Sequence, residues 1–155
     1  MAQHFLIKRK DGSVWVMIGA DDVEIDPDVE IAKWPPEQQA EIIGHEPLDY
    51  ASVNAMDRYF RNAWTHIVTG RAVGRVVVDM TKAREIHRDV LRRARTPLLE
   101  AADVDYIKAE EAADEPRKAE VRAYKQALRD VPQDPRIDAA QTPEELKAIV
   151  PDALL

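Results

Sequence analysis

The feature that most constrains the fold is a helical periodicity that runs from residue 81 to residue 131 with one short interruption. Apolar side chains recur every three or four residues along this stretch, and this spacing places them on one face of a helix. Pro132 follows directly and cannot continue the helix. A short turn at residues 113–115 divides the stretch, and helices joined by so few residues must lie beside each other. The sequence therefore predicts an antiparallel helical hairpin.

The charge of the first predicted helix changes sign along its length. Residues 82–95 carry six basic and two acidic side chains, whereas residues 98–115 carry one basic and seven acidic side chains. A single helix with this distribution would oppose its own macrodipole, which favours acids at the N-terminus and bases at the C-terminus. We therefore expect an N-cap at Thr96 with Pro97 in the first turn of a new helix, or at least a kink there.

The second predicted helix, residues 116–131, is basic and has a narrow apolar face. It contains five basic and two acidic residues, so folding back would place Lys125 and Arg129 near acids such as Asp103. Exposed ion pairs of this kind set orientation more than stability. We expect Leu128 to be a core position and Arg129 to point away from the other helix. The apolar positions expected to face each other are Val121, Tyr124, Leu128 and Val131 on one helix and Leu98, Ala101, Ala102 and the region of Tyr106 on the other.

The N-terminal half begins with β-prone residues. Residues 4–18 form two such runs around Asp11-Gly12, a dipeptide that suits the tight turn of a β-hairpin. Residues 22–26 alternate acidic and apolar side chains, a pattern that predicts an edge strand with one solvated face. Pro27 is expected to end this strand.

Four further elements are expected outside the two hairpins. A short helix is predicted over residues 34–43, with Gly44 as its end. Residues 55–67 fit both helical and strand spacing, and a helix is slightly favoured. Residues 75–78 predict a short strand. A capping box at the start of residues 142–150 predicts a last helix.

These elements predict an α+β fold in two parts. Residues 1–78 would form an N-terminal module with a β-hairpin. Residues 79–155 would form a mainly α-helical half with an antiparallel helical hairpin and a short terminal helix. A chain of 155 residues is long enough for one domain with a small appendage.

Composition argues against most kinds of chemistry. The chain contains no cysteine, which excludes disulfides, thiolate catalysis and cysteine-ligated metals. Its four histidines lie far apart in the sequence and its serines lie in no nucleophile motif, so we expect no catalytic residue, no metal site and no cofactor. A net charge of −7 argues against a general nucleic-acid binder. Neither a signal peptide nor a membrane span is expected.

Two segments of the predicted helical hairpin resemble the paired signature of small phage tail assembly chaperones. The first comprises residues 95–103, which begin Arg-Thr-Pro-Leu-Leu and end at an Asp. The second and more specific segment is Tyr-Lys-Gln-Ala-Leu-Arg-Asp-Val-Pro at residues 124–132. The family usually has an aromatic residue directly after the Asp of the first segment. Here two residues, Val104 and Asp105, separate Asp103 from the aromatic Tyr106. Residues 60–64 and 79–86 also look like small proteins encoded in phage tail-gene clusters.

The resemblance implies a non-enzymatic protein that assists the assembly of a phage tail or tail fibre through protein contacts. Its expected partner is a tail or tail-fibre protein, and self-association is left open; neither nucleic acid nor membrane is expected as a partner. It would act in the cytoplasm of a bacterial host during assembly, or stay in the virion tail. A structural component or adaptor of the tail or baseplate is the alternative interpretation. An enzyme or a nucleic-acid-binding regulator is the third.

Six residues are candidates for binding a partner. Arginines recur along one face of the first predicted helix and form either a solvated face paired with Glu85 and Asp89, or a contact surface for an acidic partner or nucleic acid. Large side chains of the hairpin are further candidates, because two helices cannot bury all of them between each other. The six candidates are Arg84, Arg88, Arg92, Leu99, Tyr106 and Arg129.

Overall fold

The computed structural model describes residues 3–20, 23–48, 51, 57–66 and 76–155. Its internal contacts divide the chain into two compact units, Met1–Asp79 and Met80–Leu155. The first unit contains small antiparallel sheets and the second is helical, so the predicted α+β fold class is confirmed. The predicted division into domains of residues 1–78 and 79–155 stays a prediction.

The N-terminal unit is built on a three-stranded antiparallel sheet of order β2-β1-β3. Strands β1 (His4–Arg9) and β2 (Val14–Ile18) form the predicted hairpin. Gly12 in its turn has a φ of 79°, a conformation that glycine adopts without steric cost. Strand β3 (Ile42–Pro47) pairs with the other edge of β1. The Asp11-Gly12 turn and the two β-prone runs therefore account for this hairpin.

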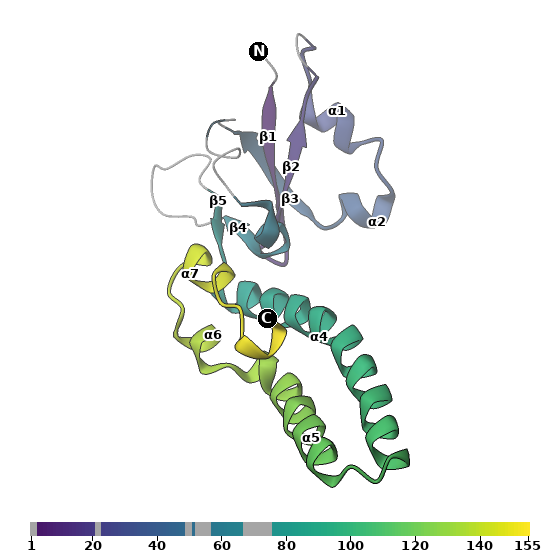
Figure 1. Ribbon diagram of the computed structural model, residues 1–155. Helices are drawn as coiled ribbons and strands as arrows, with labels where there is room; N and C mark the ends of the chain where they lie inside the picture. Colours follow the sequence, from purple (N-terminus) through teal and green to yellow (C-terminus); the bar gives the residue numbers. More distant parts are fainter. Residues whose placement is uncertain (1–2, 21–22, 49–50, 52–56, 67–75) are drawn as a thin grey trace. The chain divides into compact units, whose positions relative to one another are not determined.

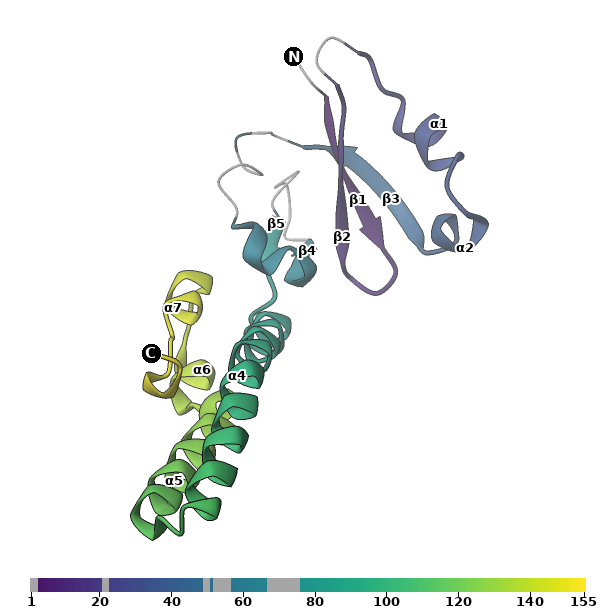
Figure 2. The same ribbon diagram turned by 45° about the vertical axis from the view of Figure 1, so that its right-hand side comes forward.

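The two faces of this sheet are covered by different segments. Leu6 and Val14 pack on one face with Leu48 and Trp64 in a buried apolar cluster. The opposite face carries Trp15, whose ring lies 5.5 Å from that of Trp34. Figures 1 and 2 show helices α1 and α2 on one side of the sheet and β4 with β5 on the other. Both faces are thus partly shielded from solvent.

The prediction of an edge strand at residues 22–26 is wrong for residues 23–26, which the structure describes. Residues 23–26 have no regular structure, and Asp22 lies outside the described residues. The side chain of Asp26 accepts a hydrogen bond from the Asp28 N–H and caps helix α1 (Pro27–Ile31). Pro27 therefore begins a helix, where its missing N–H costs nothing, and does not end a strand.

The predicted helix over residues 34–43 is too long. Helix α2 comprises only Pro36–Gln39, and β3 begins at Ile42. Gly44 lies inside β3 and pairs with Lys8, so it does not end a helix. Tertiary pairing with β1 overrides the local helical signal in this segment.

Residues 55–67 contain both of the structures that their pattern allows. A 3₁₀ helix, η1, spans Arg58–Ala63 and is followed by strand β4 (Trp64–His66). Residues 55–56 and 67 lie outside the described part. Strand β4 pairs with β5 (Val76–Val78), which confirms the strand predicted at residues 75–78 for the three residues that the structure describes.

The C-terminal unit contains the predicted antiparallel helical hairpin. Helix α4 spans Met80–Glu111 and helix α5 spans Glu115–Asp130. Figures 1 and 2 show α5 folding back along the second half of α4. The side chain of Asp114 accepts a hydrogen bond of 2.9 Å from the Arg117 N–H, and Pro116 lies in the first turn of α5. The turn thus begins α5 with a capped N-terminus.

The new helix expected to begin at Thr96–Pro97 is wrong, because α4 continues through Pro97. The kink expected there as the alternative stays a prediction. Just before the proline, Arg95 donates a 2.6 Å hydrogen bond to the carbonyl oxygen of Arg129. The Thr96 hydroxyl donates to the carbonyl oxygen of Arg92 at 2.9 Å. Packing against the end of α5 therefore outweighs the local cost of the proline.

The chain after α5 folds against the two long helices. It forms η2 (Val131–Gln133), α6 (Pro135–Ala139), α7 (Pro143–Lys147) and η3 (Asp152–Leu154). Helix α7 begins with the predicted capping box but is shorter than predicted, and the sequence interpretation missed α6. Ile137 and Leu146 are completely buried. Among the described residues, no helix combines the length and apolar character needed to cross a membrane.

Candidate partner-binding surfaces of the helical hairpin

The interface between α4 and α5 is built largely from small and branched apolar residues. Ala102 and Ala109 of α4 and Val121 and Leu128 of α5 are buried there. Leu128 is completely buried, which confirms it as a core position. Tyr124 was expected to face α4 in the same way, but 40% of its surface remains exposed. The interface is therefore incomplete beside this ring.

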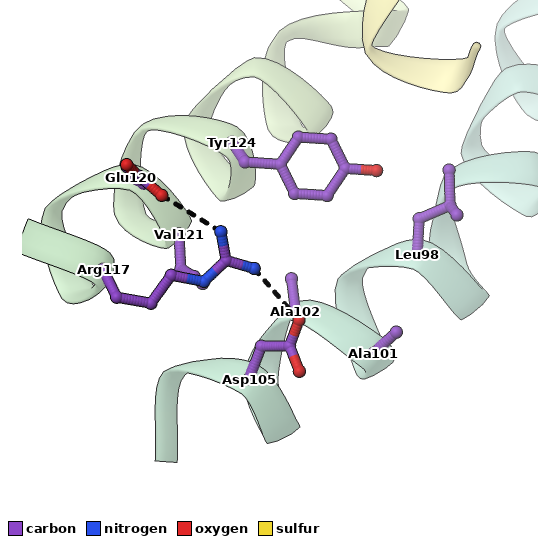
Figure 3. Close-up of a pocket in the computed structure, with 8 residues that line it drawn as sticks. All are labelled: Leu98, Ala101, Ala102, Asp105, Arg117, Glu120, Val121 and Tyr124. Atoms are coloured by element: carbon purple, nitrogen blue, oxygen red, sulfur yellow. Dashed lines mark hydrogen bonds and ion pairs between the residues drawn. The ribbon is translucent and has the colours of Figure 1, made fainter. Parts of the chain in front are cut away.

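A pocket of about 270 Å³ lies between the two helices at this position. Figure 3 shows Leu98 of α4 and Tyr124 of α5 near one end, and Arg117 with Asp105 near the other. The short side chains of Ala101 and Ala102 form part of the α4 wall and leave the space unfilled. Its lining residues are Leu98, Ala101, Ala102, Asp105, Arg117, Glu120, Val121 and Tyr124.

An ion-pair network borders the charged end of this pocket. Arg117 lies 3.0 Å from a carboxylate oxygen of Glu120 on its own helix. The same guanidinium lies 3.5 Å from a carboxylate oxygen of Asp105 on α4. All three side chains are substantially exposed, so the pairs contribute little to stability. They give the pocket one charged rim beside an apolar wall.

The opposite side of the hairpin gathers basic side chains around Tyr106. Arg122 donates a 2.7 Å hydrogen bond to the Tyr106 hydroxyl, and its guanidinium carbon lies 5.3 Å from the ring centre. The ammonium groups of Lys125 and Lys118 lie 5.4 and 6.0 Å from the same centre. The hydrogen bond to Tyr106 raises the pKa of Arg122. We call Tyr106, Lys118, Arg122 and Lys125 the cationic side.

Acids of α4, together with Glu115 at the start of α5, neutralise part of this cationic side. Lys125 forms an ion pair with Asp103, as the charge pattern predicted. Lys118 lies 3.7 Å from a carboxylate oxygen of Glu110 and 3.0 Å from one of Glu115. A hydrogen bond from Lys118 to Glu115 raises the pKa of that lysine. The paired charges fix the register of the two helices.

Arg84 and Arg88 make contacts inside the unit that the sequence did not indicate. Arg84 donates to the carbonyl oxygens of Ile137 and Ala140 at 3.2 and 2.9 Å. Arg88 donates to the carbonyl oxygen of Pro132 at 3.3 Å and to the carboxylate of Asp138 at 2.6 Å. The hydrogen bond to Asp138 is the main cause that raises the pKa of Arg88. Both arginines therefore connect α4 to the C-terminal segment.

The other four candidates lie along α4 and α5. Arg92 is exposed and forms a 2.6 Å ion pair with Asp89. Leu99 and Tyr106 are half-buried and lie seven residues apart, which places them on the same side of α4. Arg129 is exposed near the end of α5, as expected. The pocket beside Tyr124 was not predicted from the sequence. The small residues at positions 101 and 102 are the sequence feature that could have indicated it.

Within the described ranges, no group of three or more His, Cys, Asp or Glu side chains could bind a metal ion. His87 is buried and its Nε2 lies 3.1 Å from the carbonyl oxygen of Ile149. Burial lowers the pKa of His87. This histidine therefore links α4 to the C-terminal segment.

Comparisons with known proteins identify no relative of this chain. No protein-family model matches the chain. Neither the curated proteins nor the solved structures provide a match. Function must therefore be argued from the hairpin itself and from the sequence resemblance.

Proposed function

We propose that this protein is a non-enzymatic assembly protein of a phage-type tail or tail fibre, and that it acts through protein contacts of its helical hairpin. The observation that carries the proposal is the exposed ring of Tyr124 beside an open pocket. Tyr124 begins the segment that resembles the tail assembly chaperones. The ring is thus available to a client protein instead of being used in the core.

The size and lining of the pocket suit a side chain of another protein. Its volume of about 270 Å³ lies just below the range of roughly 300–1,000 Å³ typical of small-molecule sites. Five apolar residues line it: Leu98, Ala101, Ala102, Val121 and Tyr124. An apolar side chain of the client would occupy this wall, and the ion pairs of Arg117 would border its polar flank. Aromatic residues next to such pockets contribute strongly to protein association.

Co-expression with the adjacent tail-fibre gene tests this proposal. The intact protein should raise the yield of soluble fibre and co-purify with it. Tyr124→Ala, which removes the exposed ring, and Ala101→Met, which fills the pocket, should both abolish the gain. Val104→Ala is the matched control, since Val104 is an exposed apolar residue of α4 outside the pocket lining.

The results of this experiment test the assembly function and the binding pocket separately. If the intact protein neither raises fibre yield nor associates with the fibre, the assembly function is wrong. If all three variants work as well as the intact protein, the function stands and the pocket is not the binding surface. Melting temperatures of the variants show whether a loss reflects unfolding.

A permanent component of the tail or baseplate is the second candidate. It is favoured by the N-terminal unit, which forms a sheet and core separate from those of the hairpin and could serve as a docking module. Mass spectrometry of purified particles distinguishes the two roles. Stoichiometric presence in the particle supports the component, and absence supports the transient chaperone.

A further inference from the structure

The outer edge of β2, in the N-terminal unit, faces away from β1. The Arg9 N–H donates a 3.0 Å hydrogen bond to the carbonyl oxygen of Ser13, so these residues form a hydrogen-bonded pair of the β1–β2 ladder. Such pairs alternate with non-hydrogen-bonded pairs along antiparallel strands. Val14, Val16 and Ile18 therefore direct their N–H and C=O groups away from β1.

Part of this edge has no neighbouring strand among the described residues. Strand β2 is at the end of the sheet order, and β4 meets it in an isolated bridge between Ser13 and Thr65. Val16 and Ile18 lie beyond that bridge. An unpaired edge of this kind can accept one further strand.

A pocket of about 400 Å³ lies beside this edge. Its apolar wall comes from β2 and Trp64, and a polar rim comes from η1. Arg58 and Arg61 are both exposed on that rim. The lining residues are Val14, Trp15, Val16, Ile18, Arg58, Arg61, Asn62 and Trp64.

The polar groups around this pocket favour an anion. The indole N–H of Trp64 is buried and has no hydrogen-bond acceptor in the part of the chain that the structure describes. Trp64 is 8% exposed, and a buried donor left unpaired carries a free-energy cost. Arg58 and Arg61 are three residues apart on η1, and no carboxylate in the lining faces these two positive charges. A carboxylate complements these two positive charges.

We propose that the β2 edge binds an extended segment of a partner protein that carries a carboxylate side chain. Backbone groups of the segment pair with Val16 and Ile18 and add a strand to the sheet, as in β-augmentation. Its carboxylate binds Arg58 and Arg61 above the pocket. This inference concerns the N-terminal unit and does not depend on the proposed function of the hairpin.

Peptide titration followed by ¹⁵N NMR tests the proposal on the full chain. The probe is an N-acetylated, C-amidated peptide of alternating Val and Glu, and its control has Gln at every Glu. Binding of the Glu peptide should shift the amide resonances of Val16 and Ile18 and the indole N–H resonance of Trp64. The indole of Trp34 is an internal reference, because Trp34 is not among the lining residues of the pocket.

Three variants identify the contacts. Arg58→Gln and Arg61→Gln should each weaken binding about tenfold, the usual effect of removing one charged hydrogen bond. Arg117→Gln, in the other unit, is the charge-matched control and should bind like the intact protein. Ile18→Pro removes an outward N–H without removing a β1–β2 hydrogen bond, and Ile18→Thr retains it; only the proline should abolish binding.

Several results would overturn the proposal. Absence of shifts at Val16, Ile18 and Trp64 up to millimolar Glu peptide would rule out the site. Equal binding of the Gln peptide would rule out the carboxylate. Shifts at the same resonances on raising the protein concentration alone would show that a second copy occupies the edge.

Discussion

Arg84 donates a 2.9 Å hydrogen bond to the carbonyl oxygen of Ala140, 56 residues further along the chain. Its Nε also donates to the carbonyl oxygen of Ile137 at 3.2 Å. These bonds satisfy acceptors near the end of α6, next to the completely buried Ile137. One arginine of α4 thus fixes the position of the segment that follows α5.

Replacing Arg84 should therefore destabilise the protein more than replacing a solvated arginine. We expect Arg84→Ala to lower the free energy of unfolding by about 1.5–3 kcal/mol, because charged hydrogen bonds to backbone oxygens are lost. Arg92→Ala removes an exposed pair with Asp89 and should cost about 0.5 kcal/mol or less. Urea unfolding of both variants measures the difference. Equal effects would show that the Arg84 bonds contribute little.

Substitution of Leu128 should reduce stability, whereas substitution of its neighbour Arg129 should reduce association with the client. Leu128 is completely buried, and Leu128→Ala should cost about 2–5 kcal/mol. Arg129 is exposed, so Arg129→Ala should leave the melting temperature nearly unchanged and weaken association with the client. Thermal unfolding and co-purification measure the two effects. An equally large loss of stability in Arg129→Ala would make Arg129 a structural residue and contradict its binding role.

The hairpin could be predicted from the sequence because its signals are local. Apolar spacing identifies the two helices, and Pro132 ends the second. Helix α6 also had a local signal, since Asp134 caps it by accepting from the Arg136 N–H and Pro135 begins it.

Other features depend on contacts between distant residues. Gly44 interrupts the apolar pattern of β3, and the strand exists because it pairs with β1. The role of Arg84 requires a carbonyl group 56 residues away, which no local pattern reveals. The pocket beside Tyr124 arises from the absence of volume at Ala101 and Ala102. The small size of these two alanines is only a weak indication of a pocket in the sequence.

Pro97 offers a direct test of the uninterrupted helix α4. Proline lacks the N–H that would donate to the carbonyl oxygen of Arg93. We expect Pro97→Ala to raise the free energy of unfolding by about 1–2 kcal/mol, after allowing for the greater freedom of alanine in the unfolded chain. Pro116→Ala is the control, because Pro116 lies in the first turn of α5 and should give no gain. A decrease in stability for Pro97→Ala would indicate that α4 needs a distortion at this point.

The buried His87 should make the C-terminal unit sensitive to acid. His87 is 3% exposed, and burial lowers its pKa below the ordinary value of 6.5. Above that value, the histidine is neutral in both folded and unfolded chains, so it contributes no pH dependence. Below it, the unfolded chain binds a proton that the folded chain does not, and stability falls as the pH falls towards the folded pKa. The loss can reach about 1.4 kcal/mol for each pH unit between the two pKa values.

Urea unfolding at pH 7.5 and pH 5.5 measures this loss. The intact protein should lose more stability between the two pH values than His87→Gln, which retains an N–H donor and does not titrate. The remaining histidines are common to both proteins, so their titration cancels in the comparison. An identical loss in both proteins would contradict the prediction, because His87 would then have the same pKa in the folded and unfolded chains.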